Sequence, residues 1–148
     1  MKLTRLPLVG CLVALMLIGC GQPVQVPVDE AAAFAASVEP IVENCLTGLN
    51  EKDLAKHTRD FDESMLEVVD ATTFPQGYDE VIGVVGKYES RKMVGVFDQA
   101  EFRFVVYEAQ FEKDVVTIRV VFKRDDAAHK ISGLWFDSEK LRAENAPK

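Results

Sequence analysis

The sequence predicts an α+β domain in which three N-terminal helices pack on a curved, antiparallel four-stranded sheet. Hydrophobic residues recur at helical spacing in the first half of the chain, whereas the second half contains strand-like runs separated by short polar joints. The chain has 148 residues, of which 48% are hydrophobic and 28% are charged. This size and composition are typical of one globular domain.

The first 19 residues have the features of a secretory signal peptide. Two cations in MKLTR precede a short apolar run, LPLVGCLVALMLIG, which ends in small residues. The segment ending Leu17, Ile18, Gly19, Cys20 resembles the lipobox of bacterial lipoproteins. The alternative is an ordinary secreted protein whose longer signal peptide includes Cys20.

The lipobox resemblance implies that Cys20 becomes the first mature residue, carrying diacylglycerol and often a further acyl chain such as palmitate. Two or three acyl chains would hold the protein on a bilayer almost permanently, because each buried methylene contributes about 0.8 kcal/mol. The implied location is the cell membrane or the outer membrane, with the domain facing the periplasm or the cell exterior.

The mature chain is strongly acidic. Removal of residues 1–19, which carry Lys2 and Arg5, changes the formal net charge from −7 to −9. Such a charge opposes binding to nucleic acid, and it opposes adhesion to anionic lipid headgroups, because both need a basic surface. The sequence therefore predicts no nucleic-acid partner, and the membrane contact is expected through lipid on Cys20.

Cysteine and histidine are too few for a disulfide or a metal site. Cys11 leaves with the signal peptide and Cys20 is taken by lipid, so Cys45 has no partner and is expected to be a buried apolar residue. Only His57 and His129 accompany it, without CxxC, HxxxH or HExxH spacing. Nucleotide-binding motifs are missing too, and we expect no metal and no cofactor.

Residues 20–28 are expected to form the lipidated cysteine and an extended tether, because GQPVQVPV contains two prolines and no charge. At roughly 3 Å per residue the tether would span about 25 Å. The folded domain is then expected over residues 29–142, followed by a flexible C-terminal tail over residues 143–148.

Three helices are predicted before the sheet. The first begins at Asp29, is kinked at Pro40 or restarts there with Ser37 as its cap, and ends near Gly48. Its apolar stripe contains Phe34, Val38, Ile41, Cys45 and Leu49. The second is capped by Asn50 and carries Leu54, Thr58, Phe61, Met65 and Val68 or Val69. After a break at Thr72, Thr73 and Pro75, the third carries Tyr78, Val81, Ile82 and Val85 and is closed by Gly83 and Gly86.

Four strands are predicted over residues 88–98, 101–111, 115–123 and 129–137, and their short joints indicate an antiparallel meander. In the third strand, Val116, Ile118, Val120 and Phe122 alternate with polar residues, which predicts one buried face. In the second strand the apolar face changes midway. This change predicts either a β-bulge near Val105 to Tyr107 or burial of both faces.

This order of elements, ending in KISGLWFD, resembles the nuclear-transport-factor-2-like superfamily, whose fold is a cystatin-like cone. The resemblance covers residues 31–137. Within it, the segment from Asn50 to Leu54, the glycines Gly83 and Gly86, the VYEAQFEKDVVTIRVVF hairpin and the closing GLWF are similar to domain-of-unknown-function family 3887. These features mark a fold and carry no chemistry, because such cones include enzymes, binding proteins and assembly modules.

Candidate pocket residues are the polar or amphipathic side chains that could face the inside of such a cone. They are His57, Tyr78, Tyr88, Tyr107 and Trp135, with Asp60 as a further candidate. For His57, a position at the domain boundary with hydrogen bonds to solvent is favoured over one in a cavity. The aromatic residues are more often core or surface residues. Asp60, Asp62 and Glu63 are most simply a solvated turn.

We therefore expect a non-catalytic module that binds a small apolar ligand or an envelope protein. One alternative is a cone-fold lyase, isomerase or hydrolase that acts on an extracytoplasmic substrate and needs a histidine or carboxylate in its pocket. Another alternative is that the free face of the sheet forms a homodimer. No set of catalytic residues is identified.

Overall fold

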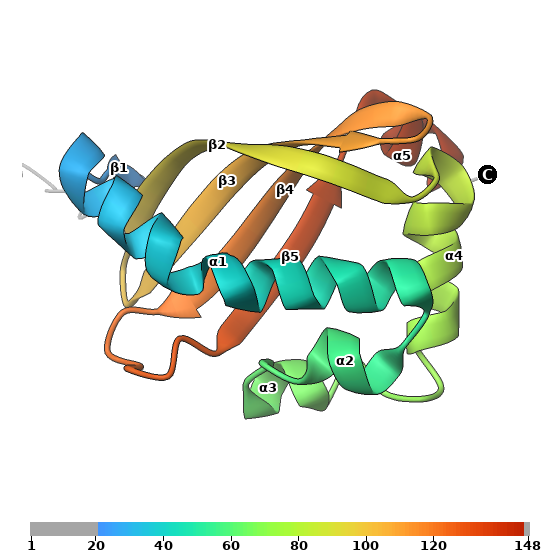
Figure 1. Cartoon of the computed structure of the whole chain (residues 1–148), viewed down its shortest axis with the longest axis horizontal. Coiled ribbons are helices and arrows are strands. Elements are labelled where there is room, and N and C mark those ends of the chain that lie inside the picture. Colours follow the sequence, from blue (N-terminus) through green and yellow to red (C-terminus); the bar gives the residue numbers. More distant parts are fainter. Residues whose placement is uncertain (1–20, 147–148) are drawn as a thin grey trace, which may run out of the picture.

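The computed structural model describes residues 21–146, so the predicted signal peptide, Cys20 and residues 147–148 lie outside the described part. The elements follow in the order β1 (Val24–Gln25), α1 (Val28–Glu51), α2 (Leu54–Thr58), α3 (Glu63–Leu66), α4 (Phe74–Val85), β2 (Tyr88–Gln99), β3 (Phe102–Phe111), β4 (Asp114–Lys123), β5 (Ile131–Asp137) and α5 (Glu139–Glu144) (Figure 1). The predicted α+β class is confirmed. The predicted numbers of helices and strands are wrong, because the described residues form five of each.

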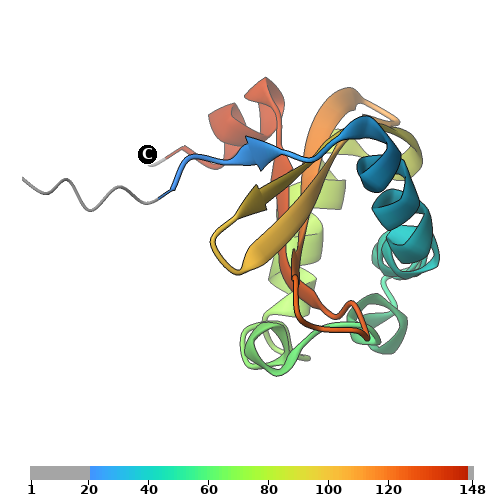
Figure 2. The same cartoon turned by 90° about the vertical axis from the view of Figure 1, so that its left-hand side faces the viewer.

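The sheet is antiparallel throughout and has the order β1-β2-β3-β4-β5. The unpredicted strand is β1, in which Val24 pairs with Asp98 and Gln25 pairs with Phe97. The next residue, Val26, is buried, and its N–H donates to the carbonyl of Val96 at 2.9 Å. The expected tether therefore contains an edge strand, and the folded domain begins at β1 instead of Asp29. Figure 2 shows this segment crossing the edge of the sheet before α1 begins.

The four predicted strands agree with β2 to β5 to within two residues at either end. The bulge predicted in β3 is wrong, because β3 pairs with β4 without interruption. In the β2–β3 pair the register shifts lie instead in β2, between Tyr88 and Ser90 and between Met93 and Gly95. The second shift lies opposite Val106 and Tyr107. The pattern change reflects the alternative prediction instead, because Phe104 and Val105, which point to opposite faces of β3, are both buried.

Helix α1 is one continuous helix of 24 residues that contains Pro40, so the predicted restart at Ser37 does not occur. Figure 1 shows a change of direction between its first turns and the remainder, which agrees with the predicted kink, since a proline cannot donate the backbone hydrogen bond. The buried stripe of α1 contains Ala31, Val38, Val42, Cys45, Leu46, Gly48 and Leu49. Burial of Cys45 is thus confirmed.

The predicted second helix is two short helices instead of one. The side chain of Asp53 caps α2 by accepting from the Lys56 N–H at 3.0 Å, and that of Asp62 caps α3 by accepting from the Met65 N–H at 3.0 Å. Between them, Phe61 forms a bridge with Ile131 of β5. Helical structure is lost there because the backbone pairs with a strand far away in the sequence.

The predicted cap Asn50 lies inside α1. Its side chain instead bonds both backbone groups of Tyr88, accepting from the N–H at 2.9 Å and donating to the carbonyl at 2.7 Å. Asn50 therefore joins the end of α1 to the start of β2.

The last two helices also differ from prediction. Helix α4 begins at Phe74, with Pro75 in its first turn, and ends at Val85, followed by Gly86 with a φ of 80°. Gly83 lies within α4 and does not close it. Helix α5 was not predicted; Ser138 caps it, accepting from the Leu141 N–H at 3.2 Å. It includes residues 143–144, which were assigned to the flexible tail.

Helix α1 crosses one face of the sheet, here called the inner face (Figures 1 and 2). The buried strand residues on that face are Tyr88, Val96, Val105, Tyr107, Ala109, Phe111, Val116, Ile118, Val120, Phe122 and Ile131. The alternation predicted for β4 is confirmed, since Val116, Ile118, Val120 and Phe122 are buried while Thr117 and Arg119 are exposed. The opposite, outer face presents the intervening residues.

Candidate functional site

The five predicted pocket residues lie in three separate places. His57 and Tyr78 line a pocket beside α2 and α4, whereas Tyr88 and Tyr107 lie in a polar cluster between α1 and the sheet. Trp135 lies on the outer face of β5, opposite Arg119. The structure therefore does not bring these residues together, because strand alternation and helix orientation point them in different directions.

The first place, here called the His57 pocket, has a volume of about 390 Å³ and lies among α2, α3, α4 and β5. Most of its lining is apolar: Leu49, Phe61, Met65, Val68, Val69, Phe74, Val81, Leu134 and Phe136. Gln76, Gly77 and Glu80 are exposed at its mouth. The pocket is thus an apolar space with a polar rim.

The position of His57 depends on a close approach of two helices. Gly48 of α1 lies against the backbone of α2, and a Cβ atom on Gly48 would lie 2.4 Å from the His57 nitrogen. Only glycine permits this distance, which real Cβ atoms essentially never show. The predicted role of Gly48 at the end of the helix is wrong, because α1 continues to Glu51 and the residue serves helix packing.

His57 is buried, so its predicted position as a solvent-bonded boundary residue is wrong. Its Nδ1 atom lies 2.8 Å from the carbonyl oxygen of Cys45. A carbonyl can only accept, so Nδ1 carries the proton and Nε2 is left as a hydrogen-bond acceptor. The rings of Phe61 and Phe74 lie 5.1 and 5.2 Å from the imidazole.

Burial lowers the pKa of His57 below its ordinary value, and the hydrogen bond to Cys45 opposes this shift only in part. The imidazole is therefore neutral at neutral pH. Cys45 is a free cysteine whose Sγ lies 3.4 Å from His57 Nδ1. Burial also raises the pKa of the Cys45 thiol far above its ordinary value, which keeps it protonated and unreactive.

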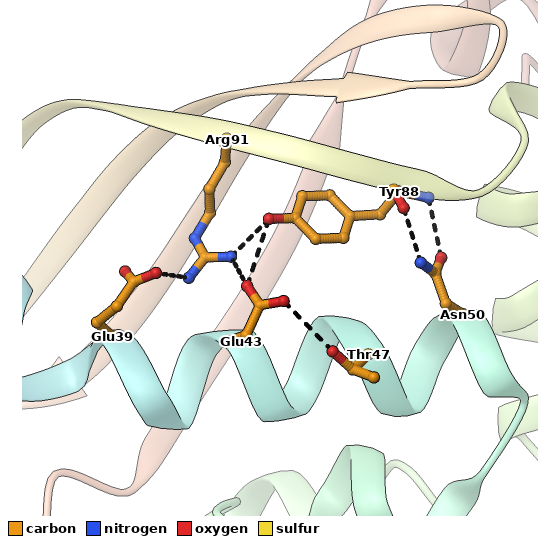
Figure 3. Close-up of polar contacts among 6 residues, drawn as sticks. All are labelled: Glu39, Glu43, Thr47, Asn50, Tyr88 and Arg91. Carbon is orange, nitrogen blue, oxygen red and sulfur yellow. Dashed lines mark hydrogen bonds and ion pairs between the residues drawn. The ribbon is translucent and has the colours of Figure 1, made fainter.

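The second place, here called the Arg91 cluster, was missed by the sequence analysis. Arg91 lies on the inner face of β2 with its side chain only 4% exposed, and it forms ion pairs with Glu39 and Glu43 of α1 (Figure 3). The Arg91 guanidinium also donates to the Tyr88 hydroxyl at 2.6 Å. The two glutamates are one helical turn apart, which is the one signal in the sequence for this arrangement.

The Arg91 guanidinium keeps its charge although it is buried. Burial opposes the charged form, but hydrogen bonds and attraction from Glu43 and Glu39 outweigh it and raise the pKa of Arg91 above its ordinary value. Both carboxylates remain more than half exposed. The cluster fastens α1 to β2 and presents paired acids to solvent instead of an open cation, which makes it a structural contact.

The two tyrosines of the cluster differ in their hydrogen bonds. Burial raises the pKa of Tyr88 above its ordinary value and raises that of Tyr107 to about 12, so both hydroxyls stay protonated. Tyr88 accepts from Arg91, whereas the buried Tyr107 hydroxyl has no hydrogen-bond partner among residues 21–146. Tyr107 contributes its ring, which lies 5.2 Å from the guanidinium of Arg91.

The acidic segment that includes Asp60 and Asp62 is not a solvated turn, contrary to the prediction. Asp60 forms an ion pair with Arg59 at 2.8 Å. Asp62 is only 11% exposed and accepts from the Ser132 hydroxyl at 2.8 Å. Burial would raise the pKa of Asp62, but several hydrogen bonds, including that of Ser132, hold it well below its usual range. The Asp62 carboxylate and the Asp60 backbone carbonyl, which accepts from the Ile131 N–H at 2.8 Å, tie the α2–α3 connection to β5.

Within the described part of the chain, no group of three or more His, Cys, Asp or Glu side chains is arranged to hold a metal ion. None of the helices among these residues has the length and apolar character that a membrane span requires. Comparisons with protein-family models, with curated proteins and with solved structures found no match.

Proposed function

We propose that the chain is a lipoprotein, anchored through Cys20 on the extracytoplasmic side of a membrane, whose domain binds a small apolar ligand in the His57 pocket. We further propose that the domain is a cystatin-like cone of the nuclear-transport-factor-2-like superfamily, similar to domain-of-unknown-function family 3887. The register shifts in β2 support this fold assignment, because bulges curve a sheet.

The observation that carries the ligand proposal is the composition of the His57 pocket. Small-molecule sites are mostly apolar concavities of about 300 to 1,000 Å³ with a few placed polar groups. This pocket, at about 390 Å³, lies at the small end of that range. Its one buried polar side chain is His57, whose Nε2 can accept a hydrogen bond. The geometry supports a small apolar molecule with one donor group, such as a hydroxyl.

The runner-up is catalysis by a cone-fold lyase, isomerase or hydrolase. A specific observation keeps it open, since His57 is buried, neutral and able to accept a proton through Nε2. Among the lining residues only Tyr78 and Glu80 could serve as a second proton donor, and both lie on α4, where Glu80 is exposed. Binding is preferred because catalysis needs such a partner aligned with the base.

Native mass spectrometry of residues 21–148 tests the ligand proposal. The protein should be purified without detergent and compared with its denatured mass, and the expected result is a bound small molecule of defined mass. The same spectra distinguish a monomer from the homodimer that the sequence analysis left open. If no ligand is retained, a screen of small alcohols and phenols by thermal shift provides a second measurement.

Two glycines of α4 allow a matched control. Gly77 lines the His57 pocket and Gly83 does not, and a Cβ atom has free space at both positions. Gly77→Leu should fill the mouth of the pocket and abolish ligand retention, whereas Gly83→Leu should leave retention unchanged. Retention by both variants, or loss in both, would contradict the assignment of this pocket.

A further inference from the structure

The outer face of the sheet divides into an apolar end near β1 and a polar end away from it. Pairing aligns its residues in rows across the strands. The rows near β1 are Gln99, Phe102, Lys123; then Phe97, Phe104, Val121, Gly133; then Gly95, Val106, Arg119, Trp135. The next row contains Lys92, Glu108, Thr117 and Asp137. We call the first three rows the anchor-side surface.

Side chains of the anchor-side surface pack on one another instead of on a helix. The rings of Phe97 and Phe104 stack with centroids 5.5 Å apart, and the Arg119 guanidinium lies 4.4 Å from the ring of Trp135. Trp135 nevertheless remains 48% exposed. A depression of about 330 Å³, lined among others by Phe102 and Phe104, lies beside it. A half-exposed indole next to an apolar depression indicates a surface that something covers.

The charge of this surface differs from that of the whole chain. None of the residues in its three rows is acidic, whereas the mature chain carries a formal net charge of −9 after removal of residues 1–19. The charged members of the rows are the cations Arg119 and Lys123, of which Lys123 pairs with Asp62 at 3.2 Å. Carboxylates return in the adjoining row at Glu108 and Asp137. The surface therefore suits a partner that is apolar or weakly anionic.

The chain reaches the anchor-side surface immediately after Cys20. Gly21 lines the depression, and its carbonyl accepts from the Gln99 side chain at 3.0 Å. Pairing of β1 with β2 holds this segment on the sheet (Figure 2). Consecutive Cα atoms are about 3.8 Å apart, so the lipid attachment point is one residue from the depression.

We infer that the anchor-side surface lies against the membrane, with Trp135 and Phe102 at the boundary between headgroups and acyl chains. The inference rests on the proposed lipid anchor. Tryptophan is favoured at that boundary because its ring is apolar and its N–H is polar, and Arg119 can extend its guanidinium to the headgroups. An anchor beside this surface, without a long free tether, holds the domain on the bilayer in one orientation.

The experiment uses the intrinsic fluorescence of Trp135, which is the single tryptophan of the whole sequence. The full chain is expressed in bacteria, and its mature product is mixed with phosphatidylcholine vesicles, with and without bromine on the acyl chains. We expect a blue-shifted emission, several-fold protection from acrylamide, and strong quenching by the brominated lipid. Flotation of the vesicles in a density gradient shows independently whether the lipid anchor holds.

The other possible results of this experiment each lead to a different conclusion. Flotation with an acrylamide-accessible, unquenched tryptophan overturns the membrane contact and leaves the anchor intact. Protection from acrylamide without quenching by brominated lipid also overturns it, because a second copy or a protein partner then covers the surface. Failure to float overturns the anchor itself, and the inference with it.

A pair of substitutions tests the surface directly. Phe102→Glu introduces a carboxylate into the anchor-side surface, and Val115→Glu introduces one at an exposed outer-face position in the polar end. Quenching by brominated lipid should fall several-fold in the first variant and stay unchanged in the second. Circular dichroism verifies that both variants fold, and equal quenching in both would contradict the inference.

Discussion

His57 and Arg91 are both buried against α1, and the protein accommodates them in opposite ways. His57 gives up its charge: its pKa is lowered, and one hydrogen bond to a backbone carbonyl satisfies Nδ1. Arg91 keeps its charge by pairing with Glu39 and Glu43, whose carboxylates remain in contact with water. A group that can lose its proton is buried alone, whereas one that cannot requires partners.

This difference makes His57 part of a potential binding site and Arg91 part of a structural contact. The neutral His57 leaves Nε2 free to accept from a ligand in an apolar pocket, while the hydrogen-bonding groups of Arg91 are largely occupied by its own neighbours. The stability contributed by His57 should depend on pH, and that contributed by Arg91 on its carboxylate partners.

The largest expected effect is at the helix contact that positions His57. Gly48→Ala should destabilise the fold by about 2 to 4 kcal/mol, because a Cβ atom would lie 2.4 Å from the backbone of α2 and the helices would have to separate. Urea unfolding measures the change. Gly77→Ala in α4 is the control, and it should stabilise by about 0.5 to 1 kcal/mol, since its Cβ meets nothing. Equal behaviour of the two variants would refute the close approach.

Next in size is the effect of removing the partners of Arg91. The double variant Glu39→Ala, Glu43→Ala should lose about 2 kcal/mol, because it leaves a buried guanidinium without its carboxylates. Arg91→Met should lose less, because the abandoned glutamates are already exposed to water. Chemical denaturation at neutral pH compares the two. A greater loss in Arg91→Met would show that packing of the side chain, and not its charge, governs the cluster.

A smaller effect is expected from protonation of His57. Its folded-state pKa lies below the ordinary value of 6.5, so the unfolded chain binds the proton first as the pH falls. The contribution of neutral His57 to the free energy of unfolding should therefore be fully present above about pH 7. The free energy of unfolding should fall by up to about 1 kcal/mol as the pH is lowered to about 5.5. His57→Gln should remove this slope, measured by urea unfolding at both pH values. Persistence of the slope would assign it to another group.

The smallest effect concerns the two tyrosines of the Arg91 cluster. Tyr107→Phe should leave stability unchanged or raise it by up to about 1 kcal/mol, because its buried hydroxyl has no partner in the described residues. Tyr88→Phe should cost about 1 kcal/mol through loss of the hydrogen bond with Arg91. Thermal unfolding of both variants provides the comparison, and a destabilised Tyr107→Phe would indicate an additional partner for that hydroxyl.

Sequence reasoning succeeded where a pattern repeats within one element. Alternation over Val116 to Phe122 predicted the buried face of β4, and helical spacing predicted the burial of Cys45 in α1. It failed where an element is too short to have a period. Strand β1 has two residues, α3 has four and α5 has six, so none of them contains enough repeats to indicate its structure.

The sequence by itself determined the α+β class and most of the strands, because local periodicity records which side of a strand or helix is buried. Only the tertiary structure decided where the candidate residues lie. It separated His57, Tyr88 and Trp135, it paired Arg91 with Glu39 across the fold, and it split the second helix where Phe61 meets Ile131. These contacts join residues far apart in the chain, and no local pattern records which distant segment will supply the partner.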